Sequence, residues 1–208
     1  MGTLDHIRWI GGGTGAGKSA AASRLSERFG LSVYASDATI QVHSARLSES
    51  TAPLLQRFRH MSMNERWVLR SPDSMYRTFP WFHGEGFNLL IEDLRRLPVT
   101  QVALVEGFRL LPHLVRPYLA DKRHAVWLMP TPEFQRNVFA LRTGAEAFWM
   151  DTSDPRRALA NVLERDQMFA KTMATEAADH GLSTLRVDGG DSLDRTVNEL
   201  ATCFGLLR

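Results

Sequence analysis

The chain has 208 residues, of which 44% are hydrophobic and 23% charged, with a formal net charge of +2. These values suit one soluble globular domain with a full core. Because no dense Lys/Arg run accompanies the small charge, neither a nucleic-acid partner nor a membrane partner is expected. The lone Cys203 excludes an internal disulfide and a cysteine metal cluster, and no apolar run reaches about 18 residues, so we expect a cytoplasmic protein.

Residues 12–19 fit the phosphate-binding pattern G-x-x-x-x-G-K-[ST], between an apolar run at 7–10 and a helix-favouring segment at 19–29. Glycines let the backbone turn sharply, so that N–H groups of the loop and of the following helix can surround a phosphate. Lys18 is expected to bring a cation to the β- and γ-phosphates, and the Ser19 hydroxyl to bind Mg²⁺. The residues predicted to hold the nucleotide here are Gly12, Gly13, Thr14, Gly15, Ala16, Gly17, Lys18, Ser19 and Ala20.

Strand and helix patterns alternate along the rest of the chain. Further strands are expected over 30–36, 101–107, 124–130 and 182–187. Helices are expected over 38–47, 87–97, 112–119, 131–142, 153–180 and from a cap at Asp191 or Ser192 to Phe204, with short helices and irregular links over 51–86. This alternation predicts one α/β domain with a mainly parallel sheet and helices on both faces.

Two acids follow strands of this sheet, Asp37 after the second and Glu106 after the third. Ligands of such sheets bind beyond the carboxyl ends of the strands, so both acids are expected beside the glycine-rich loop. Asp37 could orient or deprotonate a substrate hydroxyl, and Glu106 could hold Mg²⁺ through a water or bind a second hydroxyl. The alternatives are a helix N-cap for Asp37 and a solvated strand end for Glu106.

Two further segments suit a phosphoryl-transfer site. Residues 131–165 form a candidate lid, with flexible breaks at 143–145 and 151–153. Arg136 and Arg142 are its catalytic candidates, and Arg156, Arg157 and Arg165 are weaker ones. Residues 40–98 are rich in aromatics, which indicate either core packing or a cap that binds an acceptor. The polar candidates in this cap are His60, Arg70, Asp73, Arg77, His83 and Glu85.

Taken in order, these features resemble the P-loop kinase group, including chloramphenicol phosphotransferase-like, shikimate and gluconate kinase-like and nucleotide kinase-like members. The likeness rests on Gly12–Ser19, Asp37, Val105-Glu106-Gly107 and the arginine-bearing segment. It implies a three-layer P-loop NTPase fold with a five-stranded parallel sheet in the order 2-3-1-4-5, ATP and Mg²⁺ as co-substrates, and Asp37 as the base. Val187-Asp188-Gly189 resembles the loop against the adenine, which adds Asp188 to the cofactor-binding residues. Neither an Asp-x-Asp after the second strand nor a nucleoside monophosphate kinase lid pattern is present.

The leading hypothesis is an ATP-dependent phosphotransferase acting on a hydroxyl of a small molecule, such as an antibiotic, sugar or nucleoside. The alternatives are a nucleotide-switched regulator and a toxin-like kinase of a nucleotide sugar. The chain contains no Asn-Lys-x-Asp typical of GTPases, and it lacks the basic tract expected of a nucleic-acid end kinase. Either a monomer or a homodimer is compatible with the sequence.

Overall fold

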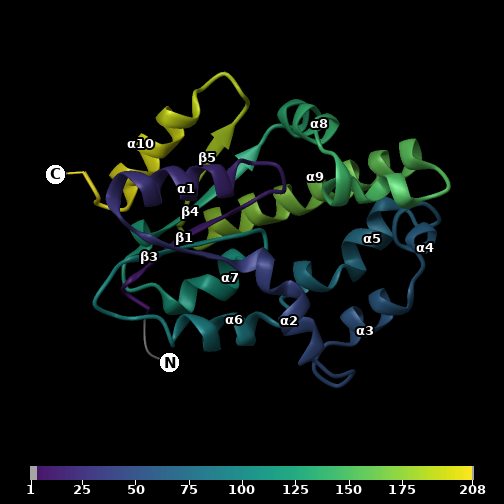
Figure 1. The fold of residues 1–208 in the computed structure, drawn as a ribbon, viewed down its shortest axis with the longest axis horizontal. Helices are drawn as coiled ribbons and strands as arrows, with labels where there is room; N and C mark the ends of the chain where they lie inside the picture. Colours follow the sequence, from purple (N-terminus) through teal and green to yellow (C-terminus); the bar gives the residue numbers. More distant parts are fainter. Residues whose placement is uncertain (1–3, 208) are drawn as a thin grey trace.

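Five parallel strands form one sheet within residues 4–207, the part of the chain that this computed structural model describes (Figure 1). The strands are β1 (Ile7–Gly12), β2 (Ser32–Ala35), β3 (Ala103–Glu106), β4 (Ala125–Pro130) and β5 (Ser183–Val187). They lie in the order β2-β3-β1-β4-β5, so the predicted sheet is confirmed. The central strands β1, β3 and β4 are mostly buried, as expected of a parallel sheet covered on both faces.

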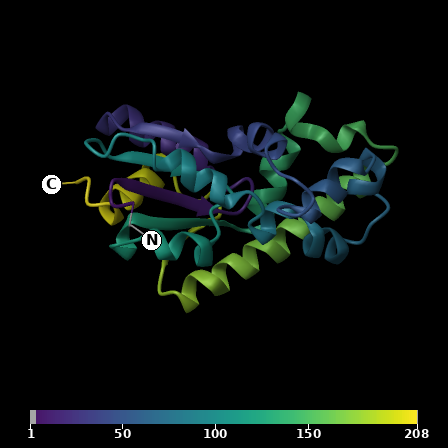
Figure 2. The same ribbon diagram turned by 90° about the horizontal axis from the view of Figure 1, so that it is seen from below.

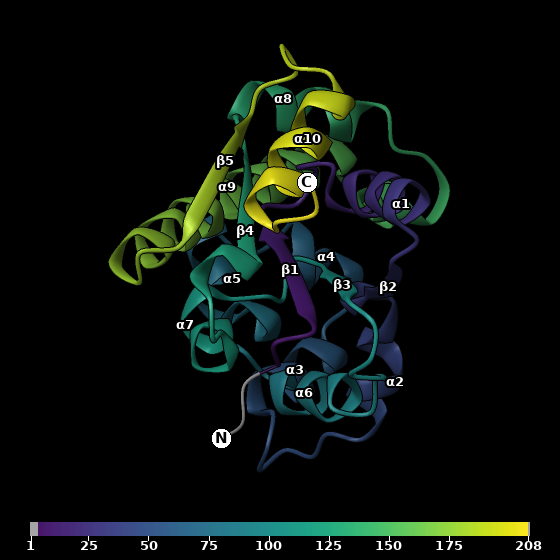
Figure 3. The same cartoon turned by 90° about the vertical axis from the view of Figure 1, so that its left-hand side faces the viewer.

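Helices cover both faces of the sheet, and alternate residues of β1 point to opposite sides. Ile7 and Trp9 pack in the cluster that α6, α7 and α9 complete, whereas Ile10 packs with residues of α1 and α10. Figure 3 shows α1 and α10 together on one side of the strands and α6 on the other. The α-helices are α1 (Lys18–Phe29), α2 (Ile40–Ala45), α3 (Pro53–His60), α4 (Met63–Trp67), α5 (Pro72–Thr78), α6 (Phe87–Leu94), α7 (Pro112–Val115), α8 (Pro132–Ala140), α9 (Pro155–Asp179) and α10 (Leu193–Cys203).

Short 3-10 helices complete the chain: η1 (Ser36–Thr39), η2 (Pro80–His83), η3 (Arg116–Tyr118), η4 (Lys122–His124) and η5 (Gly144–Asp151). Within residues 4–207, no helix combines the length and the apolar character needed to cross a membrane. Helices α3, α4 and α5 gather at one end of the molecule, beside η5 and the first turns of α9 (Figures 1 and 2). The segment predicted as a cap and the segment predicted as a lid are therefore neighbours.

Two predicted helices are each divided into two shorter ones, and the structure decides which residue caps α10. The helix expected over 38–47 is a 3-10 turn followed by the short α2, and Pro117 divides the one expected over 112–119 into α7 and η3. The cap of α10 is Ser192, whose hydroxyl accepts a hydrogen bond from the backbone N–H of Arg195 at 3.3 Å. Asp191 lies outside the helix and pairs with the Arg195 guanidinium instead.

Gly107, directly after β3, lets the ends of β2 and β3 approach closely. Its φ of 149° is one that favours glycine. A Cβ at this position would overlap the Ser36 hydroxyl oxygen and would lie 2.6 Å from Oδ1 of Asp37. The missing side chain therefore leaves the space in which Asp37 sits.

We predict that Gly107→Ala lowers the free energy of unfolding by at least about 3 kcal/mol, because backbone strain and a steric clash add together. The matched control is Gly30→Ala, which also has a positive φ of 67° but whose Cβ would meet nothing within 4 Å. The free energy of unfolding of this control should fall by only about 1 kcal/mol. Equal losses of the two variants in urea unfolding would contradict the tight approach at Gly107.

Candidate active site

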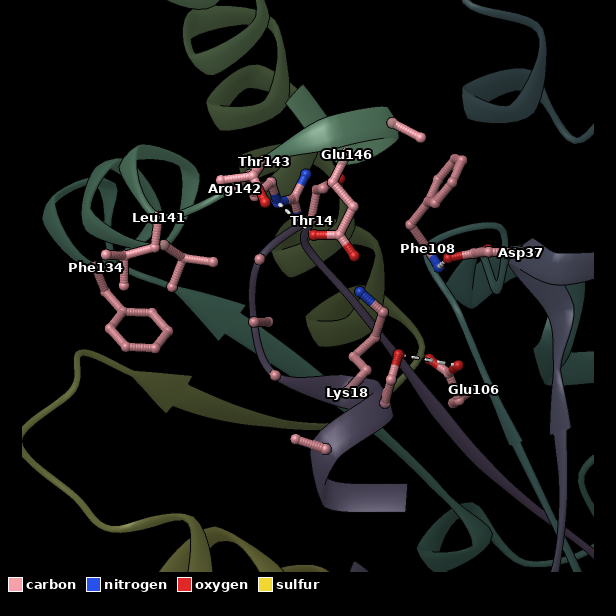
Figure 4. Close-up of a pocket in the computed structure, with 17 residues that line it drawn as sticks. Thr14, Lys18, Asp37, Glu106, Phe108, Phe134, Leu141, Arg142, Thr143 and Glu146 are labelled. Atoms are coloured by element: carbon pink, nitrogen blue, oxygen red, sulfur yellow. Dashed lines mark hydrogen bonds and ion pairs between the residues drawn. The ribbon is translucent and has the colours of Figure 1, made fainter. Parts of the chain in front are cut away.

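The glycine-rich loop between β1 and α1 lines a cavity of about 680 Å³ (Figure 4). Gly15 and Gly17 have φ values of 80° and 76°, which let the loop turn into α1. No side chain caps α1. Because the first N–H groups of a helix have no partner within it, those of Lys18, Ser19 and Ala20 are available to an anion. The loop therefore has the donor arrangement that a phosphate requires.

Gly12 and Gly13 contact β4 and are not among the residues that line this cavity, although both were predicted to bind the nucleotide. A Cβ on Gly12 would overlap the carbonyl of Leu128, and a Cβ on Gly13 would lie 2.7 Å from Cδ of Pro130. The Gly13 N–H donates to the Leu128 carbonyl at 3.0 Å. These two glycines allow close packing of β1 and the loop on β4, and the cavity is lined from Thr14 to Ala20.

Lys18 is buried beneath the loop, with 7% of its surface exposed. Its Nζ donates to the Gly13 carbonyl at 2.8 Å. Burial lowers the pKa of Lys18, while the negative charges of Asp37 and Glu106 act in the opposite direction. The ammonium is thus shielded from water, which strengthens its interaction with any anion that binds in the cavity.

Asp37 and Glu106 line the same cavity, as the strand-end rule predicts. Asp37 caps neither η1 nor α2; its Oδ2 accepts a hydrogen bond from the Phe108 N–H at 3.3 Å. Burial raises the pKa of this carboxyl, and Lys18 opposes the rise. Glu106 is only 4% exposed, so it is not a solvated strand end. The alternative roles considered for both acids are therefore wrong.

Ser19 and Glu106 both line the cavity, and Ser19 Oγ donates to Glu106 Oε1 at 3.1 Å. Figure 4 labels Glu106 and marks this hydrogen bond with a dashed line. Burial raises the pKa of Glu106, and the nearby charge of Asp37 raises it further. A hydroxyl and a carboxylate present oxygen ligands of the kind that Mg²⁺ prefers. Ser19 and Glu106 are therefore the side chains of this cavity whose oxygens suit a metal ion.

Arg142 lines the cavity from just beyond the end of α8. Its Cζ lies 4.1 Å from the ring centre of Phe139, and its Nε lies 4.0 Å from Oε2 of Glu146. Burial lowers the pKa of Arg142, but an arginine remains charged at neutral pH. Of the two leading arginines of the predicted lid, Arg142 is thus the one that lines the cavity at the glycine-rich loop.

Arg136 is exposed and does not line the cavity, because its neighbour Gln135 takes the inward position on α8. Gln135 is 2% exposed, and its Nε2 donates to the Thr14 carbonyl of the glycine-rich loop at 3.0 Å. Consecutive helix residues point about 100° apart, so Arg136 turns away when Gln135 faces the loop. Arg156 and Arg157 are exposed as well.

Asp188 also lies outside the cavity lining. It is exposed, and its Oδ1 accepts a hydrogen bond from the Gly190 N–H at 3.0 Å. The next residue, Gly189, packs on Phe134, which lines the cavity; a Cβ at Gly189 would lie 2.8 Å from its ring. The loop that follows β5 thus borders the cavity wall through Phe134, not through Asp188.

The polar candidates of residues 40–98 are engaged elsewhere or exposed. Glu85 accepts hydrogen bonds from the N–H groups of Leu54 and Leu55 at 2.9 and 2.7 Å, so it serves the first turn of α3. Asp73 and Arg77 form an exposed ion pair. Arg70 bonds to Ser74, Thr78 and Met61, whereas His60 and His83 are exposed. None of the six lines the cavity at the glycine-rich loop.

Arg109 and Asp166 were not predicted, and both are buried near the site. Nη2 of Arg109 donates to the Ser36 carbonyl at 2.8 Å and to Thr39 Oγ1 at 3.0 Å, which fixes the turn that carries Asp37. Asp166 lies close enough to Lys18 to oppose the lowering of its pKa. Arg109 lies three residues beyond the end of β3 and Asp166 lies within α9. Neither belongs to the glycine-rich motif or directly ends a strand, which are the two signals used to select site residues.

Comparison with solved structures supports the fold. The chain resembles a sugar kinase from a Janibacter species with a TM-score of 0.52 and 15% identity, over 98% of this chain and 96% of that one. A protein from Thermus thermophilus has a less similar structure (TM-score 0.48, 20% identity, 97% of each chain). So does an uncharacterised protein from Eubacterium ventriosum (TM-score 0.46, 13% identity, 96% of this chain and 98% of that one). At such identities the likeness shows a kinase-like fold alone. Neither a known family nor a curated protein matches the sequence.

We predict that Gln135→Ala weakens nucleotide binding about fivefold, because the loop loses a buried hydrogen bond of about 1 kcal/mol. Arg136→Ala is the matched control on the neighbouring residue, and its nucleotide affinity should equal that of the wild type. Titration of the nucleotide by calorimetry measures both. A larger loss of nucleotide affinity for Arg136→Ala than for Gln135→Ala would contradict the inward position of Gln135 on α8.

Proposed function

We propose that the protein is an ATP- and Mg²⁺-dependent phosphotransferase that moves the γ-phosphate to a hydroxyl of a small molecule. The observation that carries this proposal is the meeting of Lys18, Asp37 and Glu106 around one cavity at the glycine-rich loop. The loop offers N–H donors for phosphate. Glu106 is paired with the Ser19 hydroxyl, whereas Asp37 accepts from the Phe108 N–H, so we assign the two acids different roles. The likeness to a sugar kinase agrees with this reaction class.

In this proposal the glycine-rich loop and the first turn of α1 bind the β- and γ-phosphates. Ser19 and Glu106 hold Mg²⁺, which neutralises charge on the phosphates when it is bound. Lys18 has its Nζ on the Gly13 carbonyl, at the base of the loop, and stabilises the charge that develops on the transferred group. Arg142 supplies a second positive charge from the lid side.

Asp37 serves as the base or orienting group for the acceptor. The Phe108 N–H and Ser36 Oγ donate to its carboxylate and fix its orientation. The acceptor oxygen forms a bond to the γ-phosphorus as the bond from that phosphorus to the ADP oxygen breaks, and Asp37 takes the hydroxyl proton. The raised pKa of Asp37 brings it closer to the range in which a carboxylate accepts a proton efficiently.

We predict that Lys18→Met abolishes transfer of label from γ-labelled ATP to hydroxyl compounds while the melting temperature stays within a few degrees of the wild type. Methionine fills the buried space of the lysine stem but carries no charge for the phosphates. The transfer assay uses a mixed panel of antibiotics, nucleosides and sugars, and scanning calorimetry gives the melting temperature. Retained transfer in Lys18→Met would contradict the proposal, and phosphate release to water without any acceptor would favour a nucleotide switch.

We predict that transfer by the wild type falls at acid pH with a midpoint above 3.8, the ordinary pKa of an aspartic acid. Burial disfavours the charged carboxylate, so a higher pH is needed to ionise Asp37, and activity is lost as the pH falls through the raised pKa. The pH profile of kcat/KM measures this limb. Because the pKa of Glu106 is also raised, Glu106→Gln serves as the control and should keep the limb. A midpoint at or below 3.8 would exclude Asp37 as the base.

A further inference from the structure

A second cavity, of about 290 Å³, lies beside the first and is walled mainly by aromatic rings. The rings are Phe58, Trp67, Phe79, Trp81, Phe82 and Phe148, from the segments predicted as cap and lid. Many of them meet edge to face, such as Phe58 with Trp67 at 5.6 Å and Phe79 with Phe82 at 4.7 Å between ring centres. Such a wall binds apolar and aromatic groups well and hydrated polar groups poorly.

The two cavities share two residues, Thr14 and Phe108. Thr14 belongs to the glycine-rich loop, and the backbone N–H of Phe108 donates to Oδ2 of Asp37. A molecule in the aromatic cavity therefore lies beside both the phosphate loop and the proposed base. This is the position that the acceptor of a phosphoryl group must occupy, so the cavity is a candidate acceptor site within the proposed function.

Arg165 is the one charged side chain that lines the aromatic cavity among the described residues, and it is 4% exposed. Its guanidinium Cζ lies 4.2 Å from the ring centre of Phe79 and 5.1 Å from that of Trp67. Its Nε and Nη2 donate to Oδ1 of Asp166 at 2.8 and 2.6 Å, so the pair is close to neutral as a whole. The remaining nitrogen, Nη1, is buried and makes no hydrogen bond within residues 4–207.

Trp67 has a second donor of this kind, since its buried Nε1 also makes no hydrogen bond within the described part of the chain. A buried donor without a partner costs about 1–3 kcal/mol. Both donors belong to residues that line the cavity, but neither atom is accessible to water. They point to a ligand with an acceptor oxygen, toward which the Arg165 and Trp67 side chains turn when it binds. A sugar needs several polar side chains to bond its hydroxyls. Apart from the indole N–H groups of Trp67 and Trp81, the polar side chains that line this cavity are Thr14 and Arg165.

We propose, on the basis of the function proposed above, that the acceptor is a hydroxyl compound with an apolar, ring-containing body and a carbonyl or carboxylate oxygen. The ring body lies among the aromatic side chains, and its oxygen accepts from Arg165 Nη1 and Trp67 Nε1. The hydroxyl points past Phe108 toward Asp37. A free sugar is disfavoured, because several of its hydroxyls would lose water without gaining a partner.

Binding to the intact protein without nucleotide tests this proposal independently of transfer. The probes are 4-(hydroxymethyl)benzoate and its two-ring homologue 4′-(hydroxymethyl)biphenyl-4-carboxylate, with benzyl alcohol lacking the acceptor oxygen and gluconate lacking the ring. We expect one of the two ring acids to bind at least tenfold more tightly than benzyl alcohol and gluconate. Gluconate binding as tightly as the ring acids, or no ring acid exceeding benzyl alcohol, would overturn the proposal.

Trp67→Phe removes one donor and keeps an aromatic ring, whereas Arg165→Met removes the other donor. Each should reduce the preference for the ring acid over benzyl alcohol severalfold without changing ATP affinity; a preference that stays unchanged in a folded Trp67→Phe variant would contradict the assignment. Labelled ATP separates the two proposals. Ring-acid binding without phosphoryl transfer to the ring acids or to any member of the mixed panel overturns the proposed function alone. Transfer to gluconate with no affinity for the ring acids overturns the acceptor class alone.

Discussion

Parallel pairing of β1 with β3 and β4 is the constraint on which the candidate site depends. The register places Ile10 beside Glu106 and Gly12 beside Leu128, and β2 in turn places Ala35 beside Glu106. Strands paired in this way end at one edge, so the glycine-rich loop and the acids after β2 and β3 must meet there. A shift of one residue would reverse which side chains face the core, so burial on both faces holds this register.

Burial then gives the site its electrostatic character. Lys18 and Glu106 are buried and Asp37 is partly buried, and this burial shifts the pKa of each toward its uncharged form. The attraction between Lys18 and each of the two acids opposes these shifts. Under the proposed function, Lys18 then interacts with the phosphates and Glu106 with the metal ion, in surroundings where charges interact more strongly than in water.

Much of this arrangement follows from local sequence signals. The motif at 12–19 and the strand-end rule led to Lys18, Ser19, Asp37 and Glu106, since both depend on residues adjacent in the chain. The choice between the two leading arginines of the lid depends on where α8 ends. Arg136 lies within α8, next to the inward-facing Gln135, so helix geometry turns it away from the loop. Arg142 lies beyond the end of α8, so helix spacing alone does not place it.

The remaining parts of the site arise from contacts between distant segments and have no local signal. The aromatic residues of 58–82 read as core packing or a cap, but their cavity forms only where α9 brings Arg165 against Trp67 and Phe79. The polar residues of 40–98 were also predicted as ligand contacts, yet Glu85 accepts hydrogen bonds from the first turn of α3. Which polar group faces a cavity is decided by tertiary packing, which the pattern of residue types does not specify.

The central claim is that Asp37 orients and deprotonates the acceptor hydroxyl that attacks the γ-phosphate. Mass spectrometry of a metabolite extract, incubated with MgATP and either the wild type or Asp37→Asn, tests it most directly. The account predicts a compound that gains one phosphoryl group with the wild type and not with Asp37→Asn, while both proteins bind MgATP with similar affinity. Equal phosphorylation by the two proteins would contradict the role of Asp37, and release of free phosphate alone would contradict transfer.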